Sequence, residues 1–337
     1  MWRMTAAWRP VAMRLALTAL VLTPSATLAA TEAVADLQWG QPGECACADN
    51  CACGYGTWRD NTSLLFAADG WRTRADDDYP GNFGFRAGFN SGIGWWDSPI
   101  RLQLGGSYAG YDLDGRDGDF GADPISNASP EQQLILTFGF YKRSAIEADD
   151  PWAWGAVVDL LYDDHFGEES EEIFVRQSRG YLGYAWDECN EIGTTFAFQL
   201  NWARYFSDSQ GRRRVRGLDQ VNVFWHHNWE LGGDTWLHVG GAEEPGEWIL
   251  GLTGQTPLNS AVALFGGLTY VIPSAPVGDP TTIGQNYSEA YWNVSFGIVW
   301  YLGRNAANPS VSGYAGMPLL PVADNGSFLI KAPTGDL

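Results

Sequence analysis

Five cysteines carry the most reactive chemistry that the sequence offers. Cys45, Cys47, Cys51 and Cys53 form a C-x-C-x3-C-x-C motif, and Cys189 lies alone far downstream. Four thiolates at this spacing suit zinc or copper(I). In an oxidising compartment the same thiols form disulfides instead, and five of them leave one unpaired. We therefore expect structural disulfides and keep a metal clip, a covalent partner and free thiols as alternatives.

Histidine is scarce, but three of its four copies lie close together in the sequence. His226, His227 and His238 flank the pair Gly232-Gly233. A hairpin centred on Gly232 would place His226 directly opposite His238. Two facing imidazoles can share a metal or titrate near neutral pH. Because the sequence assigns no third ligand, a hydrogen-bonded pair is the favoured hypothesis.

Further polar residues alternate with large apolar ones and so share a face with these two histidines. The whole set comprises Arg86, Arg101, Asp159, Arg179, Gln199, His226, His238, Glu247 and Asn293. Their charges are mixed in sign, which fits either a narrow polar interior or one filled by its own side chains. A ring of one sign would have indicated ion selectivity, and the sequence predicts none.

His227 falls on the opposite, apolar face, where a histidine of a lipid hydrolase would stand. Neither a G-x-S-x-G elbow nor a serine at a fixed spacing accompanies it. Hydrolysis is therefore the least favoured of the functions considered.

Arg212, Arg213, Arg214 and Arg216 form the only basic cluster in a chain of net charge −20. Guanidinium groups suit the phosphates of lipopolysaccharide, but a solvated run of loop charges is the simpler interpretation. The overall acidity disfavours nucleic acid as a partner, because its phosphates require cations.

These side chains are positioned by segments in which large apolar residues alternate with small polar ones. In residues 82–90, for example, Phe83 and Phe85 alternate with Gly84 and Arg86. Such alternation predicts strands with one face toward an apolar environment. The second face carries Gly, Ser, Thr, Asn and Gln in place of Lys and Glu, as expected of a crowded lumen.

Twelve segments are predicted to be strands: 62–69, 82–90, 100–110, 132–142, 152–162, 174–186, 191–203, 217–229, 234–240, 247–254, 260–271 and 290–301. Long connections alternate with short ones, as in transmembrane barrels, and only the link at 241–246 is short where a long one is expected. We predict an all-β, up-and-down antiparallel transmembrane β-barrel over residues 61–302. If residues 62–69 do not form a strand, we expect a barrel of ten strands. A soluble β-sandwich is the alternative fold.

The ends of the chain indicate export. Residues 1–30 contain three arginines, an apolar run and a small-residue stretch, which are the features of a cleaved signal peptide. Cleavage after Ala35 is an alternative. Residues 31–60 would form a cysteine-containing periplasmic lead and 303–337 a periplasmic tail, which puts both termini on the periplasmic side of the cell outer membrane.

Residues 152–164, 222–229 and 318–328 resemble a family of uncharacterised exported proteins of planctomycete-type bacteria. The resemblance spans Trp58 to Phe328 and implies a barrel. It implies no activity, because the shared motifs are structural. In one departure, about 35 residues follow Tyr301, whereas many outer-membrane barrels end on their last aromatic strand.

Together these features predict a porin-like small-solute channel or a structural envelope protein, without a cofactor and without enzymatic activity. The alternatives are a secreted or surface β-sandwich that binds a partner and, less favoured, an outer-membrane lipid hydrolase. The expected partners are outer-membrane lipid, lipopolysaccharide, the barrel assembly machinery and a small solute.

Overall fold

A computed structural model provides the structure of the protein. It describes residues 57–73, 81–95, 98–113, 130–166, 171–207, 211–230, 232–243, 247–272, 291–303, 306–307 and 316–331. The expected signal peptide, most of the expected lead and the cysteines from Cys45 to Cys53 lie outside the described residues.

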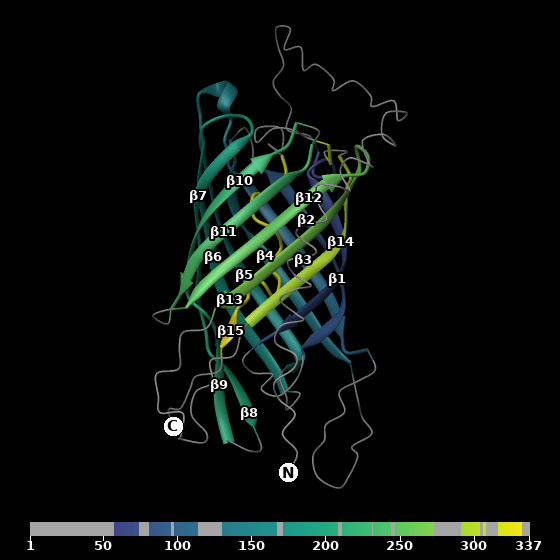
Figure 1. Cartoon of the computed structure of the whole chain (residues 1–337), viewed down its shortest axis with the longest axis vertical. Helices are drawn as coiled ribbons and strands as arrows, with labels where there is room; N and C mark the ends of the chain where they lie inside the picture. The colour runs from purple at the N-terminus through teal and green to yellow at the C-terminus, as the bar shows by residue number, and fades with distance from the viewer. Residues whose placement is uncertain are drawn as a thin grey trace, which may run out of the picture. The chain divides into compact units, whose positions relative to one another are not determined.

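Twelve strands close into a single antiparallel barrel (Figure 1). They are β1 (Thr62–Arg72), β2 (Asn82–Gly94), β3 (Arg101–Tyr111), β4 (Glu131–Lys142), β5 (Trp152–Phe166), β6 (Glu171–Ala185), β7 (Asn190–Gln199), β10 (Gln220–Asn228), β11 (Asp234–Ala242), β12 (Trp248–Pro257), β13 (Val262–Ile272) and β14 (Tyr291–Tyr301). The seam between β1 and β14 is paired from Ser63 opposite Tyr301 to Arg72 opposite Trp292. The twelve-stranded barrel is thus confirmed, and the β-sandwich alternative is wrong because the sheet closes on itself.

Side chains alternate across the wall as the two-residue period requires. On β4, Phe138 is 44% exposed on the outside, while the neighbouring Thr137 is completely buried inside. On β14, Phe296 is 57% exposed and Ser295 is buried. Large apolar groups therefore face outward and small polar groups face inward, which is the reverse of a soluble barrel.

Exposed aromatic side chains gather near both ends of the apolar exterior. At the end with short turns they are Trp95, Trp152, Trp186, Trp229 and Trp300, and at the end with long connections Tyr162, Trp202, Trp248 and Tyr270. Aromatic residues take such positions at the two membrane–water interfaces of transmembrane proteins.

Between β7 and β10 the chain forms a hairpin of β8 (Ala203–Ser207) and β9 (Gly211–Gly217), which extends beyond the barrel strands (Figure 1). A short strand near the C-terminus, β15 (Ile330–Lys331), pairs with β9 to make a separate three-stranded sheet. The sequence predicted a loop at 204–216, because the hairpin lacks the alternation of the barrel strands.

Helical structure is minor in the part of the chain that is described. A 3-10 turn, η2 (Ile146–Ala148), lies in the connection between β4 and β5. Of the described helices, none has the length and apolar character needed to cross a membrane.

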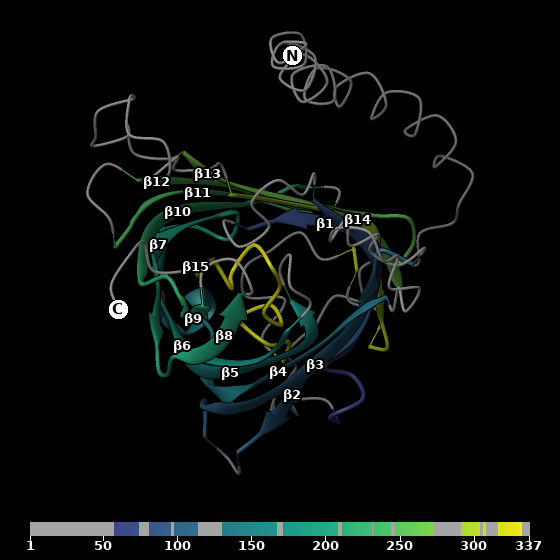
Figure 2. The ribbon, with the colours of Figure 1, turned by 90° about the horizontal axis from the view of Figure 1, so that it is seen from below.

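Residues 316–331 lie inside the barrel, where Figure 2 shows them in yellow within the ring of strands. They run from the short-turn end, beside Tyr141, to the long-connection end, where β15 pairs with β9. The sequence predicts a periplasmic tail over 303–337. For residues 316–331 this prediction is wrong, because their apolar side chains, such as Leu320 and Phe328, are buried in the interior.

The wall tolerates no side chain where two strand backbones come closest. A Cβ atom on Gly139 would lie 2.1 Å from the carbonyl oxygen of Ala156 and 2.6 Å from the Cα of Val157, whereas one on Gly94 would meet nothing within 4 Å.

We expect Gly139→Ala to lower the free energy of unfolding by about 1–3 kcal/mol through overpacking. The matched control Gly94→Ala should change it by less than about 0.5 kcal/mol. Urea unfolding in lipid vesicles, followed by tryptophan fluorescence, measures both, and equal midpoints would contradict the expected close contact.

Candidate functional site

The interior of the barrel divides into an occupied half and an open half. Side chains of β2, β3, β4 and β6 and of the β4–β5 connection bind the first part of the segment 316–331, and Leu329 near its end packs against β12 to β14. Beside the segment remains a cavity of about 370 Å³ that is lined by β10 to β14 and β1, by inward residues of β2, β3, β6 and β7, and by the segment itself. The contacts of these two halves determine what the lumen can do.

Side chains of the wall hold the segment by its backbone carbonyl groups. Tyr141 Oη donates to the carbonyl oxygen of Gly316 at 2.8 Å. Arg143 donates from Nε to Met317 at 2.8 Å and from Nη2 to Pro318 at 2.6 Å. A proline has no N–H of its own to offer, so the carbonyl groups are the obvious points of attachment.

The carbonyl groups of Leu320 and Pro321 are held in the same way. Gln103 Nε2 and Asn90 Nδ2 both donate to the carbonyl oxygen of Leu320, at 2.6 and 2.9 Å. Arg179 Nη2 donates to the carbonyl oxygen of Pro321 at 2.9 Å. The wall therefore binds residues 316–321 through their backbone carbonyl groups.

Arg179, which binds the carbonyl oxygen of Pro321, also forms a buried ion pair with Asp159. Arg179 Nε lies 2.6 Å from Asp159 Oδ2, and its Nη2 lies 3.0 Å from Oδ1. Thr137 Oγ1 donates to Oδ1 at 2.7 Å, and Gln177 Nε2 donates to Oδ2 at 3.1 Å. Both carboxylate oxygens of Asp159 are thus satisfied, and the pair carries no net charge.

A second charged group joins the segment to β1 and β2. Arg86 Nη2 lies 3.5 Å from Asp324 Oδ2 of the segment, and its Nε lies 4.0 Å from Asp69 Oδ2. Asp69 also accepts hydrogen bonds from Tyr111 Oη at 2.7 Å and from Asn293 Nδ2 at 3.0 Å. The predicted interior residues Arg86 and Asn293 therefore belong to one network.

The two predicted lumen histidines lie inside but do not face each other. His226 is paired across the strands with Trp236, and His238 with Phe224. The expected register was wrong by two residues, because it took Gly232 as the centre of the turn. Gly232 and Gly233, both with a φ of 84°, instead lie after the centre.

His226 lies between two carboxylates. Its Nδ1 is 3.4 Å from Glu191 Oε2 and its Nε2 is 3.5 Å from Asp234 Oδ2. Its ring stacks on Trp236 with centroids 3.8 Å apart. Within the described ranges no group of three or more His, Cys, Asp or Glu side chains could hold a metal ion.

The remaining members of the predicted interior set also point inward. Arg101 and Glu247 are buried at 2% and 3% exposure, and Gln199 is half-buried. Sequence reasoning missed Glu191, Asp234 and the whole segment 316–331. The uncharged run from Gly316 to Val322 in an acidic chain was the signal that could have indicated a buried segment.

The open half follows one strand along its length. All inward residues of β12 from Ile249 to Gln255 line the cavity, and two of them, Gly251 and Thr253, are small. Gly267 and Thr269 of β13 line it as well. These small side chains leave open space, whereas the space beside Gly105 of β3 and Gly155 of β5 is filled by side chains of the segment.

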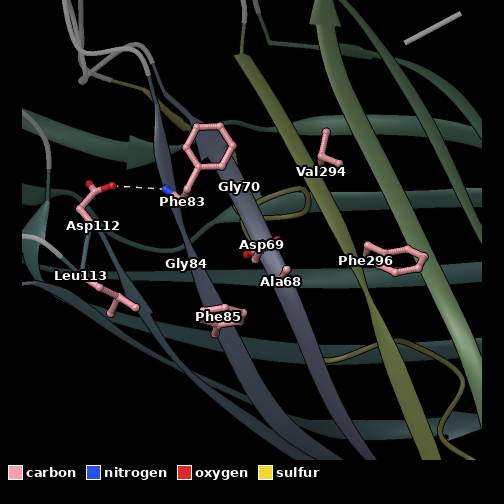
Figure 3. A pocket seen from close by; sticks show the side chains of 10 residues that line it. All are labelled: Ala68, Asp69, Gly70, Phe83, Gly84, Phe85, Asp112, Leu113, Val294 and Phe296. Atoms are coloured by element: carbon pink, nitrogen blue, oxygen red, sulfur yellow. Dashed lines mark hydrogen bonds between the residues drawn. The ribbon is translucent and has the colours of Figure 1, made fainter. Parts of the chain in front are cut away.

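A second hollow lies on the outside of the wall (Figure 3). It measures about 640 Å³ and is lined by the rings of Phe83, Phe85 and Phe296. Asp112 Oδ1 accepts a hydrogen bond from the backbone N–H of Phe83 at 3.3 Å. Asp69 belongs to this lining too, but its carboxylate is engaged by interior residues. The hollow is therefore a depression in the apolar exterior.

His227 lies on the outside, as predicted from its position, and its Nδ1 is 2.9 Å from Asn190 Oδ1. It lies between the rings of Trp225 and Trp229, with centroids at 5.6 and 4.5 Å. Cys189 lies nearby, in the turn before β7, and forms no disulfide with any described residue. Its four possible partners lie outside the described part, so its pairing stays a prediction.

Comparison with known proteins gives a family without an activity. The model of a family of unknown function (DUF6666) matches residues 62–330. No curated protein matches the sequence.

Solved structures are similar only at a distance. A chain from a study of the in-meso crystallization of membrane proteins has a TM-score of 0.43 and 10% identity, over 80% of this chain and 100% of that one. Outer membrane phospholipase A from Escherichia coli has a TM-score of 0.39 and 8% identity, over 71% and 95%. An anion-selective porin from Comamonas acidovorans has a TM-score of 0.31 and 10% identity, over 71% and 98%. Similarity at this level transfers no function.

We expect the ion pair between Arg179 and Asp159 to contribute to the stability of the folded barrel. Arg179→Gln leaves the carboxylate of Asp159 buried without its cation, which should cost about 3–5 kcal/mol of unfolding free energy. The double variant Arg179→Gln with Asp159→Asn removes both charges and should recover most of the loss. Urea unfolding of the two variants and the wild type gives the comparison. If the double variant is no more stable than the single one, the pair does not act as described.

Proposed function

We propose that this chain, which belongs to the family of unknown function DUF6666, is an outer-membrane barrel that passes small uncharged polar solutes along β12. Because the family has no assigned activity, the proposal rests on the structure of the barrel. The observation that carries the proposal is the cavity that follows the inward residues of this strand from Ile249 to Gln255.

Support for the membrane location comes from the exterior. Apolar side chains such as Leu136, Phe138 and Phe296 are 39–57% exposed there, and exposed aromatic residues border this surface at both ends. A closed barrel can cross hydrocarbon because it leaves no unpaired strand edge. The outer membrane is the compartment in which such barrels occur, and the residues of the expected signal peptide are consistent with export there.

Support for uncharged solutes comes from the way the interior charges are used. Arg179 is paired with Asp159, Arg86 with Asp324, and Arg143 donates to carbonyl groups of the segment. Asp234 and Asp324 line the cavity together with the three arginines, so its fixed charges are mixed in sign. A passage with charges of both signs attracts neither cations nor anions strongly. Hydroxyl groups such as those of Thr253 and Thr269 line the open half, and they can hydrogen-bond neutral solutes.

A structural envelope protein is the second candidate. The observation that favours it is the segment 316–331, which fills much of the lumen and has buried apolar residues such as Leu319 and Phe328. In this case the barrel would be a wall component, and the cavity would hold only water.

Planar-bilayer recordings test the proposal. The detergent-extracted protein should shift in unheated gel electrophoresis as a folded barrel and should give small, discrete conductance steps with weak ion selectivity. Proteoliposomes should swell in glycerol faster than in the larger solute sucrose. A folded but silent barrel that causes no swelling would overturn the channel proposal and leave the structural role.

A pair of substitutions on β12 locates the passage. Thr253 lines the cavity, and its neighbour Leu252 points outward. Thr253→Trp should fill the open half and reduce conductance and glycerol entry several-fold, whereas Leu252→Trp adds the same ring to the apolar exterior and should leave both unchanged. Equal permeability of the two variants would mean that solutes do not pass along β12.

A further inference from the structure

The β8–β9 hairpin is fixed by packing on one of its faces. Ala203 and Val215 are buried, and they belong to an apolar cluster with Phe166, Val175 and Ile330. Ile330 begins β15, which continues the sheet beyond β9. The hairpin therefore presents its other face in a defined orientation at the long-connection end of the barrel.

Two arginines oppose each other on that other face. Arg204 of β8 is the direct cross-strand partner of Arg214 of β9, and both side chains are exposed. Like charges directly opposite each other destabilise a strand pair. Within the described residues no carboxylate forms an ion pair with either of them, although the chain as a whole has twice as many acidic as basic residues, 40 against 20. A bound anion would remove this repulsion.

The position of the arginine pair indicates the kind of anion. Two residues further along β9, the guanidinium of Arg216 lies 4.5 Å above the ring of Trp202 and also contacts Glu243. Trp202 is 46% exposed and belongs to the aromatic residues that border the apolar exterior. The arginine pair thus lies just beyond the apolar surface, at the level where lipid headgroups would be.

We propose that Arg204 and Arg214 bind phosphate groups of the outer-leaflet glycolipid, such as those of lipopolysaccharide. Planar guanidinium groups form bidentate, charge-assisted hydrogen bonds with phosphate. The sequence alone favoured a solvated run of charges at Arg212–Arg216, and the strand register changes this preference because it pairs two cations across the hairpin. The proposal rests on the outer-membrane location proposed above, but not on transport.

Native mass spectrometry of the detergent-solubilised barrel with diphosphoryl lipid A tests this site. The double variant Arg204→Gln with Arg214→Gln should bind the lipid at least about tenfold more weakly than the wild type, equivalent to about 1.4 kcal/mol. Arg59→Gln removes an exposed arginine at the short-turn end and should leave binding unchanged. Equal affinities of the wild type and the double variant would overturn the proposal.

A charge reversal separates binding from folding. Arg214→Glu places opposite charges across the hairpin, so the hairpin should stay folded and the gel shift should persist, while lipid binding is lost. If Arg214→Glu binds lipid A as well as the wild type does, the arginine pair is not the site.

Changes to the ligand complete the binding experiment. Lipid A stripped of its phosphates should bind the wild type no better than it binds the double variant, and millimolar inorganic phosphate should not displace the diphosphoryl form. Displacement by inorganic phosphate would indicate a site for small anions and overturn the lipid assignment. A barrel that binds lipid A but is silent in bilayers would contradict the transport proposal alone, whereas one found outside the outer membrane would remove the premise of both.

Discussion

The interior of this barrel depends on one constraint, which is that inward polar groups must find partners inside the wall. Arg143, Arg179, Gln103 and Asn90 project into the interior, and donors that are buried without acceptors are costly. The carbonyl groups of residues 316–321 supply these acceptors. The segment is therefore part of the core, and the wall opposite it can afford small residues and open space.

The asymmetry of the lumen follows from this arrangement. Strands β3 to β6 carry the charged and large inward residues that contact the segment, whereas β12 and β13 carry Gly251, Thr253 and Gly267, which contact little. One barrel can thus hold both the segment 316–331 and the proposed solute path, because different strands contact the segment and line the path. The open side has neutral polar groups on β12 and β13, and its charged groups, such as His226 and Asp234, lie on β10 and β11.

The strands and the orientation of their faces could be predicted from the sequence, because a period of two is strong wherever one face is apolar and the other is small and polar. The inward position of Arg86, Asp159 and Arg179 followed from that period alone. The pairing of His226 with Trp236 did not, since register depends on the conformation of the turn around Gly232. The segment 316–331 also escaped prediction. It has no periodicity, and its contacts join residues far apart in the sequence, such as Gln103 and Leu320.

The path of the segment constrains the order in which the barrel is made. It follows β14, enters the lumen at Gly316 and reaches the far end at Lys331, while β14 itself forms the closing seam with β1. Either the ring closes around a segment that is already in position, or the segment threads through a finished ring. In the first order, formation of the seam would close the ring around the chain. In the second, a bulky globular domain fused after residue 337 would block threading, so such a fusion would reveal which step comes first.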